Sequence, residues 1–288
     1  EFAWSIVNFK IGETPQFLER FFLEWVPFYV AFKVSAVPFH SWAPDAYQGA
    51  PSPVAAFMAS GPKAAGLAVI GRISIQAFES QDEMMGLILI SIAALSIIVG
   101  SVLALSQTNM LRLLAYSSIA HAGYALMGLC GGTAEGAAST MTYAFFYVFM
   151  TIGSFGMVVA LGERGEKLEG YRGLSAQRPG MAALMLLFLL ALTGIPLTAG
   201  FTAKFVVILS AVQAGEVGLA ILAVACSVIS AFIYMRIVVL MYMKEAESPA
   251  PSRVPMALAI ALGAVLAVVL VRRSSGQERP ILPVDLLK

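Results

Sequence analysis

Long apolar runs separated by short polar segments dominate the chain. Most apolar residues fall in runs of about 18 or more, the length that a helix needs to cross the roughly 30 Å hydrocarbon layer of a bilayer. Eight membrane-spanning segments are predicted, at residues 18–42, 54–76, 84–106, 113–131, 137–162, 181–213, 217–243 and 255–271. Because apolar residues surround each segment instead of forming one stripe, we expect a lipid-embedded helix bundle.

Composition supports this all-α, polytopic membrane fold. Hydrophobic residues make up 59% of the chain and charged residues only 12%, with a mean hydropathy of +0.83. A soluble domain of this length needs more charge on its surface. The net charge of +1 and the lack of a basic cluster give no sign of nucleic-acid binding. Cys130 and Cys226 lie in apolar runs without metal-binding spacing, so we expect buried thiols and no metal site.

The polar connections predict an orientation. The longest, residues 163–178, is charged and Gly-rich and is expected to be solvated. The segment 1–17 is expected to be a non-cytoplasmic loop, and a start without a signal peptide or Met indicates a partial chain. The loops after the first, third, fifth and seventh spans should face the cytoplasm, because they carry most loop Lys and Arg. Those residues are Arg112, Arg164, Lys167, Arg172, Arg178, Lys244 and Arg253.

Apart from Glu19, Arg20 and Glu24 near the start of the first span, five basic residues and no acid fall within the predicted spans: Lys33, Lys63, Arg72, Lys204 and Arg236. A charge at the centre of a bilayer costs several kcal/mol, so each marks a candidate functional site. Arg72 and Arg236 lie near helix ends, where a long side chain can reach the interface. The lysines lie deeper. Lys63, nine residues into its span, is about 14 Å along the helix axis.

Three lysines within the membrane indicate a proton path. A desolvated lysine releases its proton more readily, and a nearby carboxylate opposes that release. An acid about 6 Å away, at an effective dielectric of about 20, contributes roughly 3 kcal/mol. Moving such an acid would therefore switch a lysine between holding and releasing a proton.

Prolines interrupt the helices that carry these lysines. Pro38, Pro62 and Pro196 cannot donate a backbone N–H, so each frees a carbonyl one turn earlier. In hydrocarbon, a freed carbonyl is tolerated only where protein or water satisfies it. Residues 193–200 (TGIPLTAG) are predicted to form a broken helix that lines a hydrated cavity. The alternative for Pro38 and Pro196 is a kink that serves packing alone.

Two histidines complete the candidate site. His40 follows Lys33 by two helical turns, although Pro38 disturbs the register, and His121 lies among hydroxyl-bearing residues within its span. The imidazole group suits proton relay, although each histidine could equally be structural. The two are expected at different depths, which argues against a bis-histidine haem. No catalytic triad, Cys cluster or phosphate-binding loop is evident, so we expect no redox cofactor in this chain.

Four stretches resemble the antiporter-like subunits of respiratory complex I. They are residues 32–51 (FKVSAVPFHSWAPDAYQGAP), 114–124 (LAYSSIAHAGY), 194–205 (GIPLTAGFTAKF) and 227–236 (SVISAFIYMR). The ending YQGAP of the first stretch and the lysine of the third are most similar to bacterial subunit N, whose counterparts are subunit 2 in mitochondria and a related subunit in chloroplasts.

This resemblance implies an architecture. The family has fourteen membrane helices and two inverted five-helix repeats, each with a broken helix. The eight predicted spans resemble the last eight, so residues 18–76 would hold the last two helices of the first repeat. Residues 84–243 would form the second repeat, and residues 255–288 the final helix and tail. The six earlier helices, including the one whose glutamate pairs with the central lysine, are not represented.

The resemblance also implies roles. Lys33 would be the central channel lysine, Lys63 the bridging lysine and Lys204 the connection to the outer face, with His40 and His121 on a hydrated axis. The implied function is proton translocation by a non-redox subunit of NADH:quinone oxidoreductase in an energy-transducing membrane, most simply the bacterial cytoplasmic membrane. Its partners would be other membrane-arm subunits, and flavin, iron–sulfur clusters and quinone are expected in other subunits of the complex. The alternatives are a subunit of a multi-subunit cation/proton antiporter and a purely structural scaffold bundle.

Overall fold

The computed structural model describes residues 28–76 and 82–246, and nearly all of this part is helical. The predicted loop 1–17 and the predicted span 255–271 lie outside the described residues, as does the first part of span 18–42. Residues 28–34 are helical and are followed by a short helix, α3 (Trp42–Gly49). The longer helices are α4 (Ser52–Gln76), α5 (Asp82–Leu105), α6 (Met110–Met127), α7 (Ala134–Leu161), α9 (Pro179–Thr193), α10 (Ala199–Gln213) and α11 (Val217–Met243).

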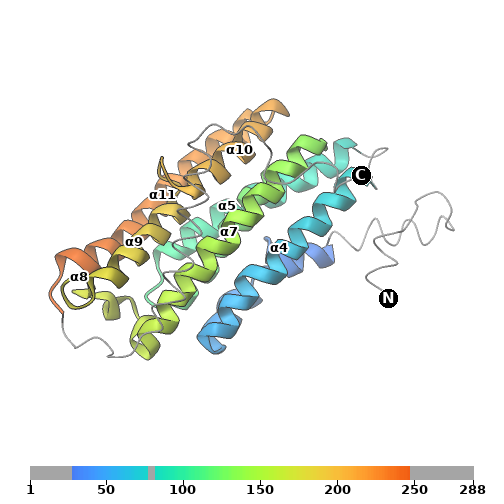
Figure 1. Cartoon of the computed structure of the whole chain (residues 1–288). Coiled ribbons are helices and arrows are strands. Elements are labelled where there is room, and N and C mark those ends of the chain that lie inside the picture. The colour runs from blue at the N-terminus through green and yellow to red at the C-terminus, as the bar shows by residue number, and fades with distance from the viewer. Residues whose placement is uncertain (1–27, 77–81, 247–288) are drawn as a thin grey trace.

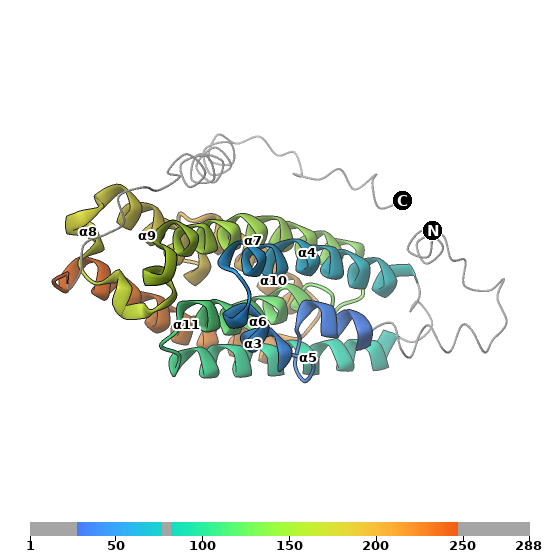
Figure 2. The ribbon, with the colours of Figure 1, turned by 90° about the horizontal axis from the view of Figure 1, so that it is seen from below.

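The long helices run side by side and enclose α6 (Figure 1, Figure 2). Helix α4 packs along α7, and α5 packs along α6 and α11. Every residue of α6 is buried except Arg112 and Tyr116, because α3, α4, α5, α7, α10 and α11 all contact it. A polar side chain on α6 is therefore shielded from lipid by its neighbours.

The helix lengths fit a multi-pass membrane protein. Within the described residues, four helical stretches are long and apolar enough to cross a bilayer: residues 52–74, 86–105, 134–166 and 217–243. Helices α9 and α10 are apolar but only 15 residues long each. Helix α6 has 18 residues and is more polar. The total of eight spans stays a prediction, because the first and last are not fully described.

Two glycines allow α5 and α6 to approach closely. A Cβ atom at Gly100 would lie 2.5 Å from the backbone nitrogen of Ala120, and one at Gly123 would lie 2.7 Å from the carbonyl oxygen of Ala93. Small residues permit such backbone contact between membrane helices. This close packing fixes the rotation of α6, and with it the direction of its polar side chains.

The backbone is interrupted near Pro38 and Pro196, whereas α4 continues through Pro62, so the prediction that Pro62 interrupts its helix is wrong. The first interruption covers residues 35–41 and the second residues 194–198. In the described part of the chain, the non-glycine residues with positive φ are Ser35 (59°) and Leu197 (77°), one in each interruption. The predicted span 181–213 is thus two helices, α9 and α10, joined by a short turn.

The segment 163–178 was predicted to be a solvated loop, and that prediction is wrong for its inner side. It forms two 3-10 turns, η1 (Gly162–Glu166) and η2 (Leu168–Tyr171), and the short helix α8 (Leu174–Gln177), with Leu168, Tyr171 and Leu174 buried. Burial raises the pKa of Tyr171, whose hydroxyl donates to the carbonyl of Gly165 over 3.0 Å. Lys167 and Glu169 are exposed, whereas Arg164 is partly buried and donates to the carbonyl of Gly170, and the three apolar side chains close the end of the bundle.

Candidate functional site

Lys63 of α4 is enclosed by protein although no acid is paired with it in the described part of the chain. Only 1% of its surface is exposed. Its Nζ atom donates to Ser118 Oγ over 2.7 Å and lies 5.8 Å from the ring centroid of Tyr47. The Ser118 hydroxyl in turn donates to the carbonyl of Ala115 over 2.7 Å. The ammonium group therefore has one hydrogen-bond acceptor, Ser118, and lies near the face of one aromatic ring, Tyr47.

Lys204 of α10 has a comparable environment, with 5% of its surface exposed. Its Nζ atom donates to the carbonyl oxygen of Thr193 over 2.9 Å and to Ser227 Oγ over 3.3 Å. It also lies 4.5 Å from the ring centroid of Tyr124. Thr193 is the last residue of α9, so the interruption supplies a backbone acceptor for the lysine. The sequence predicted a free carbonyl here, one residue earlier at Leu192.

Helix α6 connects the two lysines. Ser118, His121 and Tyr124 follow one another at intervals of three residues, and each is buried. Ser118 contacts Lys63, and the Tyr124 hydroxyl lies 2.9 Å from Ser227 Oγ, which contacts Lys204. A single helix thus presents polar groups from one lysine to the other.

Two tyrosines of α7 complete the surroundings of His121. The Tyr143 hydroxyl lies 2.6 Å from His121 Nδ1, and the Tyr147 ring centroid lies 5.4 Å from that of His121. The Tyr143 and Tyr124 rings are stacked with centroids 6.5 Å apart. We call the following set the polar axis: Lys63, Ser118, His121, Tyr143, Tyr124, Ser227 and Lys204.

The polar axis has a gap between Ser118 and His121, where no direct hydrogen bond joins the two. At a second point, between His121 or Tyr143 and Tyr124, the described residues meet through ring contacts alone. The hydroxyl groups of Tyr47 and Tyr147 are both buried without a hydrogen-bond partner. Tyr47 lies against Lys63 and Tyr147 lies against His121, so these hydroxyls flank the gap. Buried polar groups normally have a partner, and ordered water commonly supplies it.

Lys33 and His40 lie apart from the polar axis. Lys33 is exposed, with its Nζ atom 5.4 Å from the ring centroid of Tyr29, which is also exposed. The helix at residues 28–34 lies at the outside of the described bundle, packed through Val34 against Gly66 of α4. Lys63 and Lys204 are thus buried within the described bundle, whereas Lys33 lies on its surface, and the proton-relay role of all three lysines stays a prediction.

Lys33 and His40 do not lie along one helix, in agreement with the disturbance of the register expected from Pro38. The helix ends at Val34, and His40 lies in the interruption that follows. The backbone N–H of Val37 in this interruption donates to Ser96 Oγ of α5 over 2.9 Å. His40 Nδ1 and the Ser35 hydroxyl are buried there without a hydrogen-bond partner. His40 thus lies in a locally polar turn, apart from the polar axis.

The two arginines near helix ends also differ from each other. Arg72 is exposed, in agreement with a side chain that reaches the interface. Arg236 turns inward and donates to the carbonyls of Leu105 (3.1 Å) and Gln107 (2.6 Å) at the end of α5. It satisfies carbonyls that the α5 helix leaves free.

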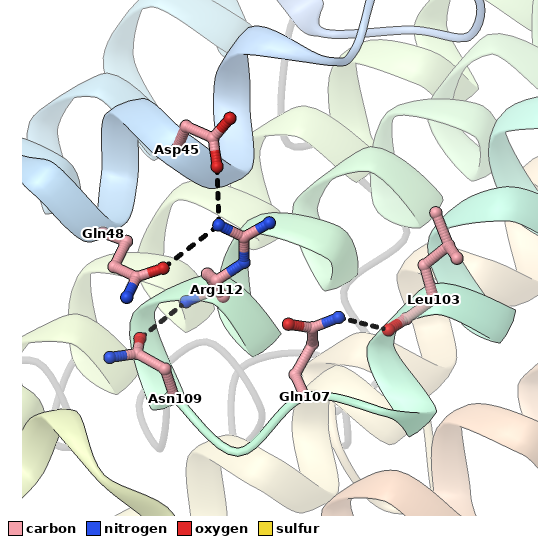
Figure 3. Close-up of polar contacts among 6 residues, drawn as sticks. All are labelled: Asp45, Gln48, Leu103, Gln107, Asn109 and Arg112. Carbon is pink, nitrogen blue, oxygen red and sulfur yellow. Dashed lines mark hydrogen bonds and ion pairs between the residues drawn. The ribbon is translucent and has the colours of Figure 1, made fainter.

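An ion pair fixes α3 against the start of α6 (Figure 3). Arg112 donates to Asp45 Oδ1 over 2.5 Å and to Gln48 Oε1 over 3.1 Å. The Asn109 side chain accepts from the Arg112 backbone N–H over 3.0 Å and caps α6. This exposed pair contributes at most about 1 kcal/mol. Its position holds Tyr47, between Asp45 and Gln48 on α3, over Lys63.

Sequence reasoning missed the aromatic part of the site. Tyr47, Tyr143 and Tyr147 were not singled out. The available signal was the spacing of Tyr143 and Tyr147 by one helical turn in an otherwise apolar helix. Within residues 28–76 and 82–246, no group of three or more His, Cys, Asp or Glu side chains could hold a metal ion.

Comparison with known proteins agrees with this geometry. A family model described as "NADH:quinone oxidoreductase/Mrp antiporter, TM" matches residues 8–233. NADH-quinone oxidoreductase subunit N of Rhodospirillum rubrum is 46% identical over 223 residues, which are 76% of this chain and 46% of that protein. Subunit N 2 of Rhizobium meliloti is 48% identical over 221 residues, again 76% of this chain and 46% of the relative.

Solved structures give the same result. A chain of respiratory complex I from Thermus thermophilus with bound aureothin aligns with a TM-score of 0.74 at 34% identity, over 85% of this chain and 55% of that chain. A chain of the Mrp complex from Dietzia sp. DQ12-45-1b aligns with a TM-score of 0.79 at 20% identity, over 86% and 56% of the two chains, which shows the shared fold alone. The chain spans about half the length of the curated relatives it matches. It belongs to the NADH:quinone oxidoreductase/Mrp antiporter transmembrane family.

Proposed function

We propose that this chain is part of a proton-translocating, non-redox membrane-arm subunit of NADH:quinone oxidoreductase, and that the polar axis carries the protons. The observation that supports this most is the enclosure of Lys63 and Lys204 at opposite ends of one set of hydroxyl and imidazole groups. In the described chain neither lysine forms an ion pair. A lysine held by neutral groups can exist with or without its proton.

The proposed transfer runs through hydrogen bonds. A proton released by Lys63 passes to Ser118 and, through water beside Tyr47 and Tyr147, to His121. His121 accepts a proton at one ring nitrogen and gives one up at the other, so the ring ends neutral. From His121 the proton crosses to Tyr124 through water, because no hydrogen bond of the described structure joins these two residues. It then reaches an unprotonated Lys204 through Ser227, and each hydroxyl accepts one proton and donates its own.

The proposed proton path also includes Lys33 and His40. We infer that Lys33 acts in the first repeat as the central lysine and that it faces a further segment of the full-length subunit. Its exposure on the described surface supports this. So does its position beside Gly66, which lies one helical turn from Lys63 on α4. The division into residues 18–76 and 84–243 as parts of two inverted repeats belongs to the same proposal. So does the identification of residues 28–49 and of α9 with α10 as discontinuous membrane helices.

The setting follows from the relatives. We propose that the chain works with other membrane-arm subunits in an energy-transducing bilayer, most simply the bacterial cytoplasmic membrane. The residues named above transfer protons only. We therefore place flavin, iron–sulfur clusters and the quinone site in other subunits.

Proton uptake alongside NADH oxidation in inverted membrane vesicles tests this function. Lys63→Ala and Lys204→Ala, introduced into the full-length subunit within the assembled complex, should each lower the number of protons pumped per NADH. Arg72→Ala removes an exposed charge from the same helix as Lys63 and should leave pumping unchanged. Normal pumping in both lysine variants would favour a scaffold role. Sodium-dependent proton exchange without NADH would favour the cation/proton antiporter.

A further inference from the structure

A small cavity between α5, α6 and α11 lies beside the polar axis. It is lined by Gly100, Ser101, Ala104, Ser117, Ala120, His121, Ser230, Ile233 and Tyr234. Four of these carry a hydroxyl group and one an imidazole. In a lipid-embedded bundle, a polar lining of this kind is costly unless its groups are hydrogen-bonded.

The cavity contains a polar atom that the described protein leaves unpaired. Ser101 is only 1% exposed, and its Oγ atom has no hydrogen-bond partner. Ser117 and Tyr234 contact each other through their hydroxyl oxygens. Tyr143 occupies Nδ1 of His121, so Nε2 is the ring nitrogen that remains for the cavity. These groups supply the two to four partners that a buried water molecule needs.

A second unpaired group lies between the cavity and the edge of the bundle. Arg236 follows Tyr234 by two residues on α11, and its Nε atom is buried without a hydrogen-bond partner. Its guanidinium group reaches the carbonyls of Leu105 and Gln107, where α5 ends. Ser101 lies four residues before that end, about 6 Å along the helix axis. Unsatisfied polar atoms therefore continue from the cavity toward the edge that carries most loop Lys and Arg.

We propose that this cavity holds an ordered water molecule between His121, Ser101 and Tyr234, and that protons pass from it along the unpaired polar atoms toward the edge at Arg236 and Gln107. Protons would then reach the polar axis at its middle, independently of its two lysine ends. The proposal rests on the proton-transfer function above. We call this connection the branch. It adds Ser101, Ser117 and Tyr234 to the groups that transfer protons, and it places Arg236 where the branch reaches the edge of the bundle.

The test compares two variants of Ser101 that differ only in having a hydroxyl or a methyl group at the same position of the side chain. Val and Thr have similar volumes, so in the assembled complex Ser101→Thr should pump several-fold more protons per NADH than Ser101→Val. Ser91 is an exposed serine on the same helix, and Ser91→Val should leave pumping unchanged. If Ser101→Val fails to assemble, Ser101→Ala removes the hydroxyl without adding volume and should show the same loss.

Two readouts separate this branch from the general function. Equal pumping by Ser101→Thr and Ser101→Val, with pumping reduced in Lys63→Ala, would overturn the branch and leave the function standing. A cryo-EM map of the complex that resolves ordered water should show density between Ser101 Oγ and His121 Nε2, and lose it in Ser101→Val. A dry cavity in that map would overturn the branch whatever the lysine variants do.

Discussion

Lys204 Nζ donates to the carbonyl oxygen of Thr193 at the point where helix α9 ends. The interruption and the buried lysine thus form one structural unit. The turn ends the i→i−4 pattern and exposes a carbonyl, and the lysine one turn into α10 satisfies it. Breaking a helix inside a membrane is costly, so a partner for the freed carbonyl is part of what makes this interruption stable.

Gly194→Ala should displace Lys204. Gly194 has φ of 83°, and a Cβ atom there would lie 2.8 Å from Lys204 Cδ. The left-handed backbone alone costs an alanine about 1 kcal/mol, and the contact adds to this. We expect fewer protons pumped per NADH in vesicles that contain the assembled complex. Gly180→Ala on the same helix meets no neighbouring atom within 4 Å and serves as the control.

Tyr124→Phe should interrupt the polar axis while keeping the ring that covers Lys204. The change removes the hydroxyl that contacts the Ala223 carbonyl (3.0 Å) and Ser227 Oγ (2.9 Å). The stability cost should be about 1 kcal/mol, with assembly preserved. Pumping should fall relative to NADH oxidation. Tyr242→Phe changes an exposed tyrosine and should have no effect. Pumping by Tyr124→Phe equal to that of Tyr242→Phe would exclude the hydroxyl from the path.

Gly123→Ala should destabilise the bundle, because its Cβ atom would meet the backbone of α5 at Ala93 and Ile97. Overpacking of this kind costs roughly 1–3 kcal/mol. The thermal unfolding temperature of the purified complex should fall, and less complex should assemble. Gly156→Ala in α7 has no atom within 4 Å of its new Cβ and should leave the unfolding temperature close to that of the parent. An unchanged unfolding temperature for Gly123→Ala would mean that the two helices can separate at no cost.

Much of the fold could be predicted from the sequence, because the bilayer sets helix length. The predicted span 217–243 coincides with α11, and the break inside span 181–213 is found at residues 194–198. The spans placed Lys33, Lys63 and Lys204 within the membrane, but they did not distinguish the two buried lysines from the exposed Lys33. The burial of Leu168, Tyr171 and Leu174 in the segment 163–178 could not be predicted, because charged residues and glycines separate them and no regular apolar spacing remains.

The surroundings of His121 depend on tertiary packing. The sequence placed this histidine among the hydroxyls of its own helix, whereas its hydrogen bond goes to Tyr143, 22 residues away on α7. Tyr47 reaches Lys63 from α3, a short helix within a stretch expected to be a break and a loop. Contacts between helices depend on their relative rotation, which apolar periodicity cannot define when apolar residues surround each helix.

The central claim is that Lys63 exchanges a proton, and Lys63→Arg tests it most directly. Arginine keeps the positive charge but does not release its proton at physiological pH. The measurement is the number of protons taken up per NADH oxidised in inverted vesicles, for Lys63→Arg beside Lys63→Ala and the parent, with complex content determined in each preparation. We predict that Lys63→Arg assembles and pumps as poorly as Lys63→Ala. Pumping by Lys63→Arg at the level of the parent would show that a fixed charge suffices at this position, which contradicts proton transfer through the polar axis.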